Sequence, residues 1–116
     1  MFTVETQSDI KTFRVNESQL DASTAKAFKE DIFAQLGDVR CVIIDMSQVT
    51  FVDSSGCGAI LSCLRKMSNQ NGELCLCHVS KPVQTVFELI RMHRIVDIHD
   101  THDDALAACR PVTDAV

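Results

Sequence analysis

A run of five residues, Cys41-Val42-Ile43-Ile44-Asp45, constrains the fold more than any other part of this sequence. Four of its residues are consecutive and apolar, so a strand formed here carries apolar side chains on both of its faces. Such a strand is typical of the middle of a sheet that helices cover on both sides. The run therefore predicts an α/β fold with this segment inside the sheet.

The apolar residues elsewhere in the chain recur alternately at the spacing of a strand and at the spacing of a helix. Residues 2–7 and 10–15 flank a short turn, which predicts an antiparallel hairpin. Residues 73–79 and 95–98 predict two later strands. Because helices connect these later strands to residues 41–45, we expect them to be parallel, with right-handed crossovers.

Four segments have the apolar spacing and the terminal residues of helices. With their caps, the expected helices run from Asp21 or Ser23 to Leu36, from Ser54 to about Gln70, from Ser80 to Ile90, and from Asp100 to Cys109. Gly37 ends the first of these helices and Pro111 ends the last. Residues 46–53 are expected to form a loop. The prediction is a single domain over residues 1–116. It contains a mixed sheet, with an N-terminal antiparallel hairpin and later parallel strands, flanked by about four helices.

The formal net charge of −5 argues against binding to nucleic acids, because the 11 Lys and Arg residues are scattered and form no basic run. The chain has no apolar run of the roughly 20 residues that a membrane helix needs. Met1 leads directly into a strand pattern rather than into a secretory signal. These features predict a cytoplasmic protein without membrane insertion.

Six cysteines are the other unusual feature of the composition. Most stand among aliphatic residues, and cysteine is often fully buried, so we expect them to be small core side chains. A chain of this length folds without a disulfide or a metal, and a reducing compartment is the expected setting. Cys75 and Cys77 share one face of a strand. Core packing is favoured there over zinc binding, which usually uses a wider spacing and a second pair.

The segment Asp53-Ser54-Ser55-Gly56-Cys57-Gly58 joins the loop to the start of a helix and carries the functional hypothesis. In a purely structural interpretation, Ser54 caps the helix and the glycines allow close packing. The same position tolerates a phosphate, because the first amides of a helix lack intrahelical partners and carry partial positive charge. From physical chemistry alone, the capping interpretation is favoured.

Five segments of the chain, one of which contains residues 53–58, together match the sequence pattern of a known family. They are residues 20–25, 42–47, 49–61, 72–74 and 82–87. In order and spacing, over nearly the whole chain, they resemble the STAS domain family, which includes the bacterial anti-sigma factor antagonists. The chain departs from the usual pattern at Ser18, at Cys57 and at residues 91–94. These departures bear on partner specificity more than on mechanism.

The resemblance implies a partner switch centred on Ser54. In antagonists of this family, the serine after the aspartate is phosphorylated by the partner anti-sigma factor, a serine kinase. The unphosphorylated domain would bind that kinase and free its sigma factor, phosphate on Ser54 would end the binding, and a PP2C-type phosphatase would reset the switch. The implied partner-binding residues are Asp21, Ser23, Asp53, Ser55, Gly56 and Cys57. No cofactor is expected.

Two alternatives within the same family stay open. In the first, the chain is a STAS adaptor subunit of a transport ATPase or of a stress-signalling complex. In the second, it is a STAS domain that binds a small ligand. An enzyme is not expected, because the chain lacks the Gly-x-Ser-x-Gly nucleophile elbow and any glycine-rich phosphate loop.

Two groups of reactive residues have a structural interpretation that we favour over a chemical one. Cys57 lies in the first turn of the Ser54 helix, where a lowered thiol pKa would permit redox chemistry, but a leucine-like packing role explains it as well. Residues 99–104 are rich in His and Asp, yet their spacing matches no strong zinc motif. A helix start with acids in its first turn accounts for them. We therefore expect no metal site.

Overall fold

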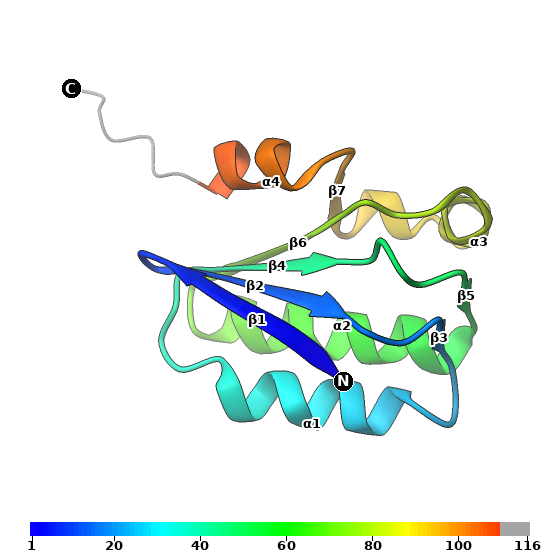
Figure 1. The fold of residues 1–116 in the computed structure, drawn as a ribbon, viewed down its shortest axis with the longest axis horizontal. Coiled ribbons are helices and arrows are strands. Elements are labelled where there is room, and N and C mark those ends of the chain that lie inside the picture. The colour runs from blue at the N-terminus through cyan, green and yellow to red at the C-terminus, as the bar shows by residue number, and fades with distance from the viewer. Residues whose placement is uncertain (110–116) are drawn as a thin grey trace.

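The computed structural model describes residues 1–109, and the strands of its main sheet and its four helices follow the predicted order (Figure 1). The strands are β1 (Phe2–Gln7), β2 (Ile10–Val15), β3 (Gln19–Leu20), β4 (Cys41–Asp45), β5 (Phe51–Val52), β6 (Glu73–Cys77) and β7 (Asp97–His99). The helices are α1 (Ala25–Gln35), α2 (Ser54–Asn69), α3 (Lys81–Leu89) and α4 (His102–Cys109), with a 3-10 turn at Met92–Arg94. None of these helices combines the length and apolar composition needed to cross a membrane. Pro111, expected to end the last helix, lies outside the described residues.

Five strands form a mixed sheet in the order β1-β2-β4-β6-β7. The β1–β2 pair is antiparallel, and every other pair in this sheet is parallel, as predicted. The apolar run at residues 41–44 lies in the central strand, and all four of its side chains are fully buried. The α/β fold with a mixed sheet and four helices is confirmed.

Helices cover both faces of the sheet (Figure 1). On one side, α1 and α2 pack against each other and against the sheet, and Phe13, Phe28, Ile44 and Ile60 form part of a large apolar core between them. On the other side, α4 alone contacts β4, β6 and β7. The domain therefore has one thick and one thin apolar layer.

Several boundaries differ from the prediction because a local turn competes with the regular element. The first helix begins at Ala25, with Thr24 rather than Asp21 or Ser23 at its N-cap position and no side-chain cap, because the Asp21 carbonyl accepts the amides of Thr24 and Ala25 in a preceding turn. The strand β6 ends at Cys77, because the next residue has φ +55°. The strand β7 begins at Asp97, because the amides of residues 95 and 96 donate to the Met92 carbonyl.

The pattern did not predict the two-stranded parallel sheet of β3 and β5. Gln19 pairs with Phe51 and Leu20 pairs with Val52, so half of this sheet lies in the segment expected to be a loop. Two-residue strands are too short to show a period in sequence. Their pairing holds the chain before α1 against the chain before α2.

All six cysteines are buried, as expected. The expectation that none would form a disulfide is wrong for one pair, because Cys41 and Cys109 are joined in this structure. Their Cα atoms lie 6.2 Å apart, within the range that a disulfide spans. The pair comes together because α4 packs back across β4, and two cysteines separated by 68 positions gave no sign of this contact in sequence.

Candidate functional site

Asp53 caps α2, so the capping role expected for Ser54 belongs to its neighbour. The Asp53 backbone is extended, with φ −110° and ψ −171°, and its Oδ1 accepts the amide of Gly56 at 3.0 Å. A carboxylate at this position satisfies an orphan amide and interacts favourably with the helix dipole. Ser54 is consequently the first helical residue, and its hydroxyl is not required as a cap.

Ser54 and Ser55 are both exposed at this helix end, and Gly58 is exposed one turn later. A phosphate on Ser54 would lie outside the fold, near the unpaired amides of the first turn. Its nearest acidic neighbour in sequence is Asp53, whose two carboxylate oxygens already accept amide hydrogens. The geometry therefore makes the Ser54 hydroxyl accessible to a docking protein.

Gly56 has an internal role, in contrast to the partner-binding role that the resemblance implied. It is buried, and a Cβ built on it would lie 2.1 Å from the Leu20 carbonyl oxygen. The helix backbone thus touches the end of β3 directly. Gly58 differs, because nothing lies within 4 Å of a Cβ built there.

The same carboxylate that caps α2 also reaches the loop before α1. Asp53 Oδ2 accepts the amide of Ala22 at 3.3 Å, and the Asp53 amide donates to the Leu20 carbonyl at 3.3 Å. Together with the β3–β5 pairing, these bonds hold the two loops side by side. The partly exposed Asp21 and the exposed Ser23 therefore belong to the same end of the domain as Ser54.

Asp21 is held in its ionised form by local hydrogen bonds. Its Oδ1 accepts the Ser23 hydroxyl at 2.6 Å and the Ser23 amide at 2.9 Å. These bonds lower the pKa of the Asp21 carboxyl below its ordinary value of 3.8, with the Ser23 hydroxyl as the largest cause. The loop before α1 thus presents a fixed negative charge near Ser54.

Phe51 is the surface residue that the pattern did not single out. It lies in β5, three residues before Ser54, and half of its surface is exposed. Val52 beside it is buried, so the alternation of the two side chains was the available signal. We call the surface at this end of the domain the α2 end. It consists of Asp21, Ser23, Phe51, Asp53, Ser54 and Ser55.

Cys57 is a packing residue in this structure. Its side chain is only 4% exposed and belongs to the main apolar core. Burial, and then the charge of Asp53, raise the pKa of its thiol. The lowered pKa that a redox role would need is therefore absent, and the leucine-like role is the one observed.

Residues 99–104 run from the end of β7 into the start of α4, so a helix start lies within them as the favoured interpretation stated. The Asp104 amide donates to Thr101 Oγ1 at 3.0 Å, so Thr101 caps α4 in place of Asp100. Asp103 and Asp104 lie in the first turn. Within residues 1–109, the one group of three or more metal-ligating side chains that lie close together is elsewhere, at Asp45, Cys77 and His78.

Known proteins match this fold and this sequence. The STAS domain family matches residues 1–105. An anti-sigma F factor antagonist from Paenibacillus polymyxa is 28% identical over 97 residues, which cover 82% of this chain and 83% of that protein. The crystal structure of an anti-sigma factor antagonist from Mycobacterium paratuberculosis superposes with a TM-score of 0.83 at 25% identity, covering 96% of this chain and 94% of the other.

The family match spans the sheet, the helices α1 to α3, the first turn of α4 and the α2 end, and the segments that carried the resemblance lie within it. The chain belongs to the STAS domain family.

Proposed function

We propose that this protein is an anti-sigma factor antagonist that works in the cytoplasm by partner switching. Its partner is an anti-sigma factor that is also a serine kinase. The unphosphorylated protein binds this kinase through the α2 end and so releases the sigma factor. Phosphorylation of Ser54 ends the binding, and a PP2C-type phosphatase restores it.

The observation that carries the proposal is the exposure of Ser54 at the first position of α2, beside a cap that is already complete. Because Asp53 satisfies the Gly56 amide, modification of Ser54 leaves the helix start intact. The half-exposed Phe51 supplies apolar contact area next to it. The names of the relatives found above support the same partner class.

A phosphate would disrupt such an interface through charge. It adds about −1.5 to −2 elementary charges and acceptor oxygens that must be desolvated when a partner covers them. The α2 end already carries the carboxylates of Asp21 and Asp53, so the added charge has like charges for neighbours. A loss of about 1.4 kcal/mol weakens binding tenfold, and a few such losses end it.

The experiment is intact-mass analysis of the protein after incubation with the candidate kinase and ATP. We expect a gain of one phosphate in the wild type and in Ser55→Ala, and none in Ser54→Ala. Ser55→Ala is the matched control, because Ser55 is an exposed hydroxyl on the next residue of the same helix. Phosphate that persists in Ser54→Ala would place the modification elsewhere and overturn the proposal.

Binding completes the test. We expect the kinase to bind wild-type protein and Ser54→Ala, and to lose Ser54→Asp and the phosphorylated protein. Binding that ignores both changes would rule out the switch even if Ser54 is phosphorylated. In that case the adaptor role in a transport ATPase or stress-signalling complex, or the binding of a small ligand, becomes the better account of the α2 end.

A further inference from the structure

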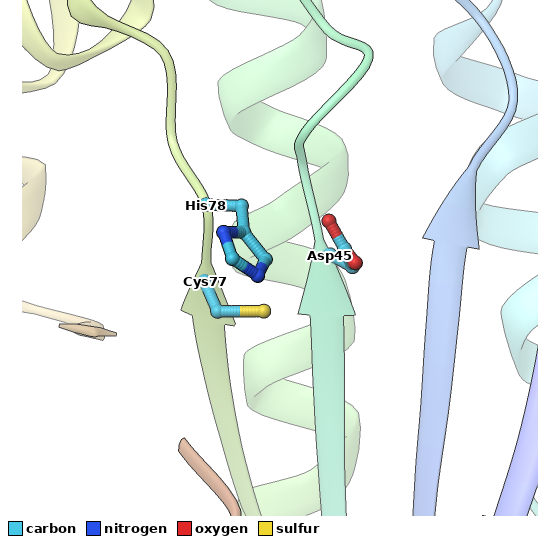
Figure 2. Close-up of side chains that lie close together, drawn as sticks. All are labelled: Asp45, Cys77 and His78. Atoms are coloured by element: carbon cyan, nitrogen blue, oxygen red, sulfur yellow. The ribbon is translucent and has the colours of Figure 1, made fainter. Parts of the chain in front are cut away.

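A left-handed residue follows the end of β6. His78 has φ +55°, a conformation that is uncommon outside glycine, although histidine is one of the residue types enriched there. Successive side chains of an extended strand point to opposite faces. The left-handed turn interrupts that alternation, and Figure 2 shows the His78 ring above Cys77, turned toward Asp45.

Three ligand types meet at this point. Asp45 ends β4 and Cys77 ends β6, and the two residues are direct partners in the parallel register. A carboxylate oxygen, the thiol sulfur and an imidazole nitrogen of Asp45, Cys77 and His78 all lie within 4.8 Å of one another. The Cys77 side chain is fully buried, while Asp45 is only partly buried, so the group opens to solvent on one side.

We propose that Asp45, Cys77 and His78 form a binding site for a divalent transition-metal ion of the zinc class. Carboxylate, thiolate and imidazole are the ligands that Zn²⁺ takes in proteins, at distances of about 2.0–2.3 Å. Ligand atoms in a tetrahedral site are therefore closer together than 4.8 Å, so binding requires side-chain rotations that bring these three to that spacing. With three protein ligands, water occupies the fourth position.

Two neighbouring groups bear on the proposed ion. The Ser47 amide donates to Asp45 Oδ1 at 2.9 Å, which orients the carboxylate as outer contacts orient metal ligands. His99 is the register partner of Cys77 on the other side. Its Nε2 is buried and has no hydrogen-bond partner within residues 1–109. A metal-bound water in this region would offer such a partner.

Metal binding releases a proton from Cys77. The sulfur–metal bond forms as the sulfur–hydrogen bond breaks, and the proton leaves to buffer.

The ion also competes with α4 for His78. The amide of His102, the first residue of α4, donates to His78 Nε2 at 3.3 Å. A neutral imidazole has one lone pair, so a metal at either ring nitrogen removes this acceptor. Metal binding thus frees the first amide of α4, and hydrogen exchange at His102 speeds up on binding.

The test uses the full chain without an affinity tag, with its cysteines reduced, titrated with Zn²⁺ in a calorimeter and with Co²⁺ in a spectrophotometer. We expect one ion per chain and a thiolate-to-Co²⁺ charge-transfer band. Asp45→Asn and His78→Asn should weaken Zn²⁺ binding at least about tenfold, and Cys77→Ala should abolish the charge-transfer band. Asparagine suits His78, because it also tolerates the left-handed conformation.

Cys63→Ala and His93→Ala are the matched controls, since Cys63 is a buried thiol in α2 and His93 is an exposed imidazole. Both should bind Zn²⁺ like the wild type. Absence of stoichiometric binding overturns the proposal. So does binding that survives His78→Asn and Asp45→Asn but is lost in Cys75→Ala, because the ion would then lie among the other thiols under α4.

Discussion

The two faces of the sheet are built from different side chains. Under α1 and α2, the core is built from large aliphatic and aromatic residues such as Phe13, Phe28 and Ile60. Under α4, cysteines make up four of the seven buried residues, and two of the four are joined in the disulfide. The seven residues are Ile10, Cys41, Ile43, Cys75, Cys77, Ala105 and Cys109. The thick layer fixes the helix that presents Ser54, whereas the thin layer holds one eight-residue helix and carries most of the reactive side chains.

Substitutions at two neighbouring residues of β4 measure the difference in packing between the two layers. Ile44 faces the thick layer and Ile43 faces the thin one, and both are fully buried. Ile44→Ala should lower the free energy of unfolding by about 4 kcal/mol, because the surrounding core cannot collapse onto the cavity. Ile43→Ala should lower it by about 2 kcal/mol, because α4 settles toward the sheet. Urea denaturation measures both, and equal losses would contradict the contrast between the layers.

Substitution of Gly56 tests the contact between the helix α2, which packs in the thick layer, and the neighbouring loop at the α2 end. Gly56→Ala should destabilise the fold by about 1–3 kcal/mol, since its Cβ meets the Leu20 carbonyl oxygen. Gly58→Ala, two residues later in open space, should stabilise the helix by up to about 1 kcal/mol. Thermal denaturation of the two variants should therefore give shifts of opposite sign. A neutral Gly56→Ala would mean that the two backbones do not touch.

The helix caps differ between the two sides as well. Asp53 accepts amides from α2 and from the loop before α1, whereas within residues 1–109 Thr101 accepts an amide only from its own helix. Asp53→Ala should cost about 1–2 kcal/mol and Thr101→Ala about 0.5 kcal/mol. Chemical denaturation measures both losses. Asp53→Asn, which keeps an acceptor, is the control and should lose least.

The smallest expected effect concerns the Asp21 carboxyl. Because its pKa is lowered in the folded state, its contribution to stability is present above pH 3.8 and is lost as the pH falls through the folded value. Ser23→Ala removes the hydroxyl bond, so the Asp21 pKa should rise toward its ordinary value while the fold stays intact. Carboxyl titration by nuclear magnetic resonance measures the shift. An unchanged titration in Ser23→Ala would show that the hydroxyl is not the cause.

The order of the elements and the sheet were predictable because they rest on local periodicity and on the handedness of crossovers. The run at residues 41–44 placed β4 at the centre, and Gly37, with φ +58°, follows the end of α1 as expected. The position of Ser54 at the start of α2 was also predictable. Capping by Asp53 was not recognised, although an aspartate three residues before a glycine amide is the spacing that an N-cap uses.

The remaining features depend on contacts between distant residues or on single backbone angles. The β3–β5 pair joins segments more than 30 residues apart, and Cys41 meets Cys109 only because α4 folds back. The group at Asp45, Cys77 and His78 depends on the left-handed turn at His78. None of these features produces a periodic pattern in the amino-acid sequence, so sequence patterns alone did not predict them.

The direct contact of Gly56 with Leu20 has a consequence for recognition. Two main-chain segments meet there without a side chain between them, so no rotamer change can alter the offset of the helix from the neighbouring loop. A docking protein would therefore meet a template of constant shape, so under the proposed switch the phosphorylated and unphosphorylated forms would differ in charge rather than in arrangement.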